Sequence, residues 1–243
     1  MLTLKGDGGN RLSTALARDL LAGLREAAGM PQVRALVLEG GDNFCVGADL
    51  KERAALPQER WAEHHAAFEK LALALQDVQQ PTIAAVRGWA LGGGCELALG
   101  CDIVVASPDA RFGQPEALRG LVPGMGGPQL LVRRLPHDMA AYLLYTGAIL
   151  DAASAHRLGL VTFLDADPTA RALAIASEIA KASPVAVRAL RRLLQQAPQA
   201  FEAAYAFELE AWREAVASGD AVEGARAFVE KRAAEFAEGN KPR

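Results

Sequence analysis

The chain has 243 residues, enough for one large domain or two modest ones with a sizeable hydrophobic core. Hydrophobic residues make up 51% and charged residues 23%, and the net charge of −3 gives no reason to expect nucleic acid or an anionic membrane as a partner. No apolar run is long enough to span a bilayer. The three cysteines, Cys45, Cys95 and Cys101, lack metal-site spacing, and we expect reduced thiols in a cytoplasmic protein.

The first half of the chain alternates predicted strands and helices. This alternation favours an α/β sheet whose strands are joined by crossover connections. In chain order we predict a strand at 2–5, a helix capped by Ser13 or Thr14 that ends at Gly29, a strand at 33–38, helical sequence after Phe44–Glu52, a long helix from Pro57 to about Gln79, and strands at 82–86 and 102–106.

The second half is mostly helical from Gly126 onward. We predict one brief strand at 160–163, and Pro184 suits the first position of a helix. The last 45 residues have the pattern of two amphipathic helices. We therefore place an α/β core at residues 1–184 and a helical C-terminal region at 185–243, in one continuous unit. The aromatic residues of the two final helices are Phe201, Tyr205, Phe207, Trp212, Phe228 and Phe236.

The most informative stretch runs from Pro81 to Gly127. A short apolar strand precedes Gly92-Gly-Gly-Cys-Glu96, and three glycines after a strand predict a tight turn that opens a helix. The first N–H groups of a helix lack internal partners and favour an oxyanion. Glu96 is expected in the first turn of that helix, and a second carboxylate follows in Phe112-Gly-Gln-Pro-Glu116. An N–H cradle and two carboxylates are the parts needed for acid–base chemistry beside a carbonyl.

These motifs, with Pro123-Gly-Met-Gly-Gly127, closely resemble the crotonase superfamily of enoyl-CoA hydratases and isomerases. The resemblance covers nearly the whole chain, and Phe44-Cys-Val-Gly-Ala-Asp-Leu-Lys51 is similar to the family's first thioester-binding loop. It implies an α/β crotonase fold, a spiral of ββα units with a C-terminal α-helical trimerisation region. It also implies an acyl-CoA thioester substrate, a homotrimer or homohexamer, no metal, and no cofactor apart from the CoA of the substrate.

The resemblance assigns roles to four positions. The backbone N–H groups of Ala48 and Gly93 would bind the thioester oxygen as it becomes an enolate, and such a donor contributes roughly 3–4 kcal/mol to transition-state stabilisation. Glu96 and Glu116 would hold a water between them, with Glu96 deprotonating the water and Glu116 delivering a proton to Cα. The division of roles stays open because two carboxylates that share a proton titrate as a unit.

The resemblance also implies further contacts with the substrate. The Gly124 N–H would help to position the water. Asp49, Leu50 and Lys51 would line the CoA site, while Phe228 and Lys231 would contact the adenine end; for Lys231 a solvated side chain is the alternative.

The predicted activity is reversible syn addition of water to a 2,3-enoyl-CoA. Isomerases of the family generally use one carboxylate near the position of Glu116, so the presence of Glu96 as well favours hydration. Two alternatives stay open: another crotonase reaction, such as isomerisation, decarboxylation or hydrolysis of a cyclic or aromatic-pathway acyl-CoA, and a non-catalytic or RNA-binding crotonase-like protein. The sequence lacks the Gly-x-Ser-x-Gly, P-loop and dinucleotide-binding motifs.

The chain departs from the family pattern at Cys45-Val46, Arg87, Pro128 and Leu130. We expect Val46 to narrow the space near the thioester and Arg87 to add a charge at the rim of the site. These changes predict an acyl group other than a plain short fatty chain. The four histidines, among them the adjacent His64 and His65, lack ligand spacing, and we expect them on the surface.

Overall fold

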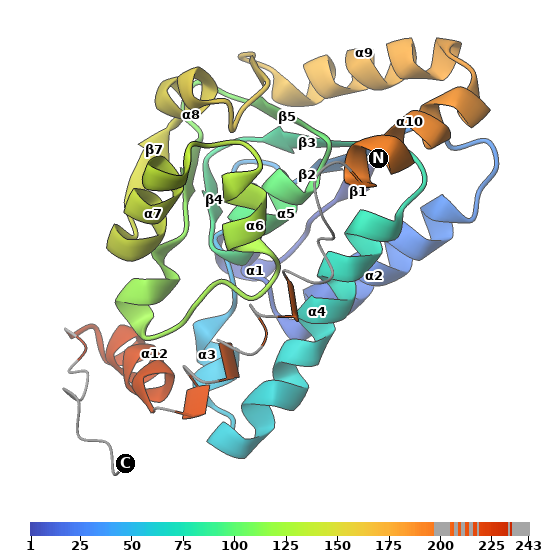
Figure 1. The fold of residues 1–243 in the computed structure, drawn as a ribbon. Coiled ribbons are helices and arrows are strands. Elements are labelled where there is room, and N and C mark those ends of the chain that lie inside the picture. The colour runs from blue at the N-terminus through green and yellow to red at the C-terminus, as the bar shows by residue number, and fades with distance from the viewer. Residues whose placement is uncertain are drawn as a thin grey trace.

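The computed structural model describes residues 1–196, 205–206, 209, 212–213, 216–217, 219–232 and 234. At its centre lies a five-stranded parallel sheet with the strand order β1-β2-β3-β5-β8 (Figure 1). The parallel pairing confirms the expected crossover connections, because each pair of neighbouring strands is joined through a helix or a long segment. These strands are β1 (Leu2–Thr3), β2 (Leu36–Glu39), β3 (Thr82–Val86), β5 (Ile103–Ala106) and β8 (Phe163–Leu164).

A second, three-stranded sheet has the order β4-β6-β7, with β4 and β6 parallel and β6 and β7 antiparallel. Its first strand follows β3 after a turn at Gly88, which has a φ of 53°. A Cβ atom at Gly88 would lie 2.4 Å from the Asp42 carbonyl oxygen, so only glycine fits this turn. The strands are β4 (Trp89–Leu91), β6 (Arg111–Gly113) and β7 (Ile149–Asp151).

The central sheet is covered on both faces. Side chains alternate along β3: Ala84 and Val86 belong to the main core, whereas Ile83 and Ala85 pack in a smaller cluster with α9 (Pro168–Lys181). Because both faces are buried, every residue of β3 is buried, which matches the continuous apolar sequence. Figure 1 shows α9 across one face of the sheet and α2 and α4 on the opposite side.

Helices connect the strands of the two sheets. The Ser13 hydroxyl caps α2 by accepting a hydrogen bond from the Leu16 N–H at 3.1 Å, as one of the two expected capping residues. None of the described helices is long and apolar enough to cross a membrane. The other helices are α1 (Asp7–Asn10), α2 (Thr14–Ala28), α3 (Leu50–Ala54), η1 (Gln58–Arg60), α4 (Trp61–Asp77), α5 (Gly93–Gly100), η2 (Pro115–Arg119), α6 (Gly127–Val132), α7 (His137–Thr146), α8 (Ala152–Leu158), α10 (Pro184–Gln196) and α12 (Asp220–Glu230).

Several bounds differ from the sequence-based expectations. The strand expected at 33–38 is β2 (Leu36–Glu39), and the brief strand expected at 160–163 is β8 (Phe163–Leu164). β4 (Trp89–Leu91) was not expected, because its glycine-rich surroundings resemble a turn and its partner β6 lies some twenty residues later. Of the residues expected in the two final helices, Phe201, Phe207 and Phe236 lie outside the described residues.

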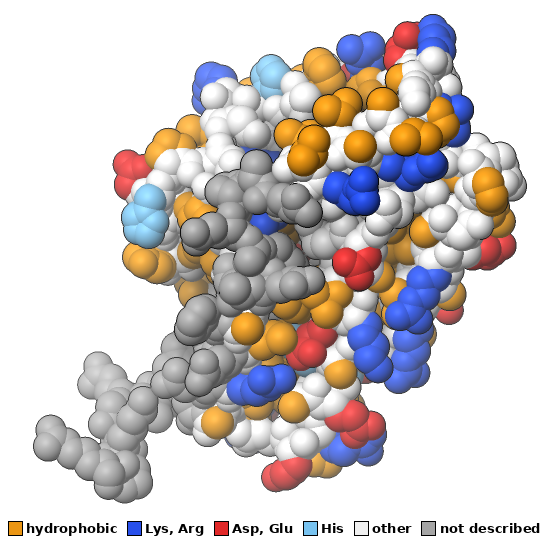
Figure 2. Space-filling view, turned by 45° about the vertical axis from the view of Figure 1, so that its right-hand side comes forward, with side chains coloured by type: hydrophobic (Ala, Val, Ile, Leu, Met, Phe, Trp, Pro, Cys, Tyr) orange, Lys and Arg blue, Asp and Glu red, His pale blue; other side chains and the backbone are white. Residues whose placement is uncertain are grey.

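The helix α10 exposes an apolar surface. Figure 2 shows hydrophobic side chains gathered on the upper part of one face of the molecule, where α9 and α10 lie in Figure 1. Large apolar residues on a monomer surface usually mark a contact with another surface. The exposed fractions in α10 are 68% for Val185, 58% for Leu190, 62% for Leu193 and 75% for Leu194.

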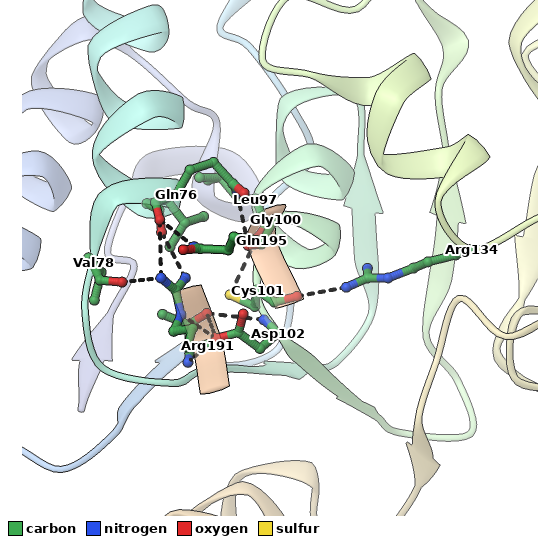
Figure 3. Close-up of polar contacts among 11 residues, drawn as sticks. Gln76, Val78, Leu97, Gly100, Cys101, Asp102, Arg134, Arg191 and Gln195 are labelled. Atoms are coloured by element: carbon green, nitrogen blue, oxygen red, sulfur yellow. Dashed lines mark hydrogen bonds and ion pairs between the residues drawn. The ribbon is translucent and has the colours of Figure 1, made fainter. Parts of the chain in front are cut away.

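One buried arginine of α10 attaches this helix to the core (Figure 3). The Arg191 Nε atom donates to Asp102 Oδ2 at 2.8 Å, and its terminal nitrogens donate to carbonyl oxygens at the C-terminal end of α4, including that of Gln76 at 3.1 Å. The same Asp102 oxygen accepts a hydrogen bond from the Thr82 N–H at 2.7 Å. Arg191 therefore joins α10 to the end of α4 and to the start of β3, and it satisfies carbonyls that a helix end leaves unpaired.

Candidate active site

Two backbone loops meet beside the second sheet. The loop before α3 pairs with β4, since the Cys45 N–H donates to the Trp89 carbonyl oxygen at 2.9 Å and the Leu91 N–H donates to the Cys45 carbonyl oxygen at 3.0 Å. A Cβ atom at Gly94 would lie 2.0 Å from the same Cys45 oxygen, so glycine is required for this approach. The contact brings Ala48 of one loop and Gly93 of the other to the wall of one cavity.

The N–H groups of Ala48 and Gly93 are available as donors. Within the described part of the chain neither donates to another residue. Gly93 is the first residue of α5, where helix N–H groups lack internal partners. Two such groups on one cavity wall can bind an oxygen that gains negative charge during a reaction.

Glu96 lies in the first turn of α5, as expected, and its side chain is 3% exposed. Its Oε1 atom accepts hydrogen bonds from the Met125 N–H at 2.7 Å and from the Gly127 N–H at 2.8 Å. Burial raises the pKa of the Glu96 carboxyl, while the N–H groups of Met125, Gly127 and Gly124 oppose this rise. The N–H groups of the turn before α6 limit this rise, and the pKa of Glu96 is raised to about 7.

Glu116 lies on η2 and is partly buried beside the same cavity. Burial raises the pKa of its carboxyl, and the negative charge of Glu96 raises that pKa further. The Gln114 side chain lies next to it, and with its amide nitrogen turned toward Glu116 it donates to both carboxylate oxygens at 3.2 Å. The two glutamates thus form a pair that favours one shared proton.

The cavity has a volume of about 590 Å³ and combines these groups in one space. Both carboxylates and both free N–H groups border it, together with Val46 and the apolar Leu121, Val122 and Met125. Among the described residues, no group of three or more His, Cys, Asp or Glu side chains is placed to hold a metal ion. The site therefore offers acid–base groups and N–H donors next to apolar walls.

Comparison with known proteins decides the family. Residues 2–240 match the family described as enoyl-CoA hydratase/isomerase. This chain belongs to the crotonase superfamily. A probable enoyl-CoA hydratase of Mycobacterium bovis is 39% identical over 236 residues, which cover 93% of this chain and 89% of the relative. The 2,3-dehydroadipyl-CoA hydratase of Escherichia coli is 38% identical over 231 residues, covering 93% of this chain and 90% of that protein.

Solved structures agree with this assignment and confirm the expected α/β crotonase fold. The crystal structure of carnitinyl-CoA hydratase from Mycobacterium avium has a TM-score of 0.82 and 37% sequence identity, and the match covers 93% of this chain and 90% of that one. An acyl-CoA substrate is implied for this crotonase by its family.

The residues expected at the CoA end of the crotonase site all border the cavity. Asp49 also has a structural role: its Oδ1 atom accepts a hydrogen bond from the Lys51 N–H at 2.9 Å and caps α3, and its Oδ2 atom lies 3.3 Å from Arg11 Nε. The Phe228 ring is 48% exposed and lies 5.3 Å from the Arg119 guanidinium carbon. The residues in question are Asp49, Leu50, Lys51, Phe228 and Lys231.

Two expectations about this crotonase were wrong. His64 and His65 are buried, not on the surface, with exposed fractions of 8% and 3%. His65 stacks on Trp212 with ring centroids 4.1 Å apart, an aromatic partner nearly 150 residues away that no local pattern reveals. Arg87 lies outside the cavity, because its terminal nitrogen donates to Asp167 Oδ1 at 3.0 Å on the outer surface.

One cavity residue, Arg53, was not expected from the sequence. Arg53 follows the thioester-binding loop on α3, and its side chain is 4% exposed at the cavity wall. A local signal for Arg53 was present in the sequence. Arg53 lies three residues after Leu50 on a short helix, so the two side chains share one helix face, and the face that carries Leu50 is expected to turn inward.

Proposed function

We propose that this crotonase is an enoyl-CoA hydratase that reversibly adds water, in the syn sense, to a 2,3-enoyl-CoA. The observation that carries the proposal is the pairing of Glu96 and Glu116 on one cavity wall, next to the unpaired N–H groups of Ala48 and Gly93. Isomerisation of the double bond needs only one proton-transferring carboxylate, whereas addition of water needs a group for the water and a group for Cα. The pair therefore supports hydration over isomerisation.

The Ala48 and Gly93 N–H groups would bind the thioester oxygen, which becomes negatively charged when water attacks Cβ. Loss of one such donor typically costs roughly 3–4 kcal/mol of transition-state stabilisation. Because they donate only when a substrate oxygen is present, these two groups would stabilise the enolate without first breaking a contact inside the protein.

The surroundings of the two carboxyl groups support distinct roles. Three backbone N–H groups favour the ionised form of Glu96, which suits a base that orients and deprotonates the water. Glu116 faces that negative charge, which favours its protonated form and suits proton delivery to Cα. One proton then passes from water to Glu96 while another passes from Glu116 to Cα, so the pair keeps one proton overall.

The direct test is hydration of crotonyl-CoA, which is monitored through the loss of enoyl absorbance. We expect Glu96→Gln and Glu116→Gln each to lower kcat by about 10²–10⁴-fold with little change in CoA-ester binding. Glu59→Gln changes an exposed glutamate of η1 and is the matched control. Near-normal hydration by either active-site variant would refute the assignment, and release of free CoA or a shifted double bond would point to hydrolysis or isomerisation.

The exposed residues at the border of the cavity support an assignment of the contacts with CoA. We assign Lys51 to the pantetheine or phosphates and Phe228 with Lys231 to the adenine end, because all three are exposed at the cavity border. The names of the relatives include several acyl groups, among them dehydroadipyl-CoA and carnitinyl-CoA. Family membership therefore leaves the acyl chain of this enzyme to be inferred from its own cavity.

The same proposal includes assembly as a homotrimer or homohexamer. The exposed leucines of α10 support it, because symmetric association is the usual way to cover such a face. The Arg191 contacts hold this helix in place on the core, so its outer surface is presented in a fixed orientation.

A further inference from the structure

Arg53 is a buried cation in the cavity wall, with a side chain that is 4% exposed. Its Nε atom has no hydrogen-bond partner among the residues that the structure describes. Within the described residues it forms no ion pair, although Glu116 and Glu52 are the nearby charges that favour its protonated form. A buried charge is costly unless a partner satisfies it, so the free protein leaves this guanidinium incompletely satisfied.

Two aromatic rings lie close to Arg53. Its guanidinium carbon lies 5.7 Å from the Trp61 ring centroid and 5.8 Å from the Trp212 ring centroid. Two indole rings hold the cation by cation–π attraction and limit the positions it can take. In the described part of the chain no oxygen acceptor accompanies these rings, and an aromatic face is no substitute for the two oxygens that a guanidinium fork can bind.

The neighbouring histidines do not supply such an acceptor. His65 Nε2 is 2.9 Å from the Gly124 carbonyl oxygen, and burial lowers the pKa of its ring to about 3, so the ring is neutral at pH 7. His64 Nε2 lies 3.4 Å from Glu52 Oε2, and that carboxylate also accepts from the Thr14 N–H at 2.9 Å. Glu52 is thus engaged by other partners, while burial lowers the pKa of Arg53 only to about 10, which keeps it charged.

Arg53 borders the same cavity as the N–H donors of Ala48 and Gly93, so a substrate bound to those donors lies in the space that Arg53 faces. With the thioester oxygen on the Ala48 and Gly93 N–H groups, the large CoA part must leave through the exposed rim near Phe228 and Lys231. The acyl chain would then extend within the same cavity, beside the buried part of its wall. That part is formed by Arg53, His65, Phe68 and Trp212.

We propose that Arg53 binds a carboxylate on the distal end of the acyl chain, so that the preferred substrate is an enoyl-CoA with a second, negatively charged carboxyl group. This inference rests on the proposed hydratase function and names its substrate class. A guanidinium and a carboxylate form a planar, bidentate pair, and the apolar and aromatic walls strengthen it by excluding water. A site built to bind a charged group discriminates strongly against an analogue that lacks it, because the arginine is then left buried and unpaired.

The test uses two pairs of substrates, and the two members of a pair have the same chain length. The first pair is trans-2-pentenoyl-CoA and its analogue with a carboxylate in place of the terminal methyl group. The second pair is trans-2-hexenoyl-CoA and its corresponding carboxylate analogue. We expect the wild-type enzyme to favour the carboxylate substrate of at least one pair by roughly 10²-fold or more in kcat/KM. Arg53→Met keeps an unbranched side chain without charge and should abolish this preference, mainly through KM, while Arg53→Lys should retain part of it.

Arg60→Met is the matched control, since Arg60 is exposed on the neighbouring η1 and pairs with Glu63 at 2.6 Å. It should leave the preference unchanged. A wild-type enzyme that hydrates both members of each pair equally would overturn the inference while leaving the hydratase function intact. If Arg53→Met lowers kcat/KM equally for both substrates of a pair, the inference would also be overturned. Such a result would show that Arg53 affects catalysis only through the charge of Glu116.

Binding of the saturated acyl-CoA counterparts separates the inference from catalysis. Calorimetry should show tighter binding of the carboxylate-bearing thioester to wild type than to Arg53→Met, by roughly the same 10²-fold, even if neither enoyl substrate is hydrated. Equal affinities for the two proteins would contradict the role of Arg53. Circular dichroism should show that Arg53→Met is folded. If it is not, Arg53→Lys takes its place and should bind the carboxylate-bearing thioester more weakly than wild type, and an affinity equal to that of wild type would contradict the role of Arg53.

Discussion

The Glu116 carboxylate occupies the space beside Gly92 because Gly92 has no side chain: a Cβ atom on Gly92 would lie 2.7 Å from Glu116 Oε1. Gly92 has φ 51° and ψ −126°, a backbone conformation that other residues rarely adopt. It directly precedes Gly93, so one turn both presents an N–H donor and makes room for a carboxylate. Gly92 therefore contributes both to the position of the oxyanion donor at Gly93 and to the position of the Glu116 carboxylate.

We predict that Gly92→Ala lowers kcat for hydration by about 10²-fold, because the methyl group displaces the Glu116 carboxylate and small misplacements of reacting groups have effects of this size. The matched control is Gly41→Ala. Gly41 also has a positive φ, 68°, but a Cβ atom there would have no neighbour within 4 Å. Both variants should lose roughly 1–3 kcal/mol of stability from backbone strain, and only Gly92→Ala should lose turnover. Equal kinetics in the two variants would show that Gly92 does not position Glu116.

Local sequence patterns located the main elements of this site. β3 at Thr82–Val86 was predicted with its observed bounds, because an apolar run between Pro81 and the turn at Gly88 defines a buried strand. Glu96 was placed correctly in the first helical turn, because glycines after a strand mark the start of a helix. The family resemblance supplied the remaining expected site residues.

Long-range packing accounts for what the sequence did not reveal. The burial of His65 depends on Trp212, and the outward position of Arg87 depends on its ion pair with Asp167. Each of these partners is set by the tertiary fold, so a periodicity or spacing argument has no access to it.

The pH dependence of stability tests the raised pKa of Glu116. A carboxyl whose pKa is higher in the folded than in the unfolded protein supports folding below the unfolded value, about 4.3, and this contribution is lost as the pH rises through the folded value. Glu116→Gln cannot ionise. Its free energy of unfolding, relative to wild type, should therefore increase between pH 5 and pH 9, by about 1.4 kcal/mol for each unit of the pKa difference.

Urea unfolding at pH 5, 7 and 9 measures this change, with Glu59→Gln as the exposed control that should show a constant difference. A difference between Glu116→Gln and wild type that stays flat over this range would mean that the Glu116 carboxyl has an ordinary pKa. Such a result would remove the physical basis for its role as the proton donor.

Arg191→Met tests the attachment of α10 to the core. The substitution removes the charged donor from the Asp102 carboxylate, which keeps the Thr82 N–H, and from several carbonyl groups at the end of α4. Hydrogen bonds to a charged group contribute roughly 1.5–3 kcal/mol, and we expect a loss of stability in this range by urea unfolding. Arg192→Met changes the next residue of the same helix, which is exposed, and should have little effect. Equal stabilities of the two variants would argue against an anchoring role for Arg191.

The exposed leucines of α10 predict the assembly state. Leu193 and Leu194 are 62% and 75% exposed, and a symmetric contact would remove both from water, at about 25 cal/mol for each Å² of apolar surface buried. Light scattering at micromolar concentration should therefore give a wild-type mass near three or six times the 25.7 kDa of one chain. Leu194→Glu would place a charge in that contact, where it would be buried without a partner, and should yield smaller species. Val132→Glu, at an exposed valine of α6, carries the same charge change and should leave the mass unaltered. A wild-type protein that is monomeric under these conditions would show that the apolar face of α10 does not serve self-association.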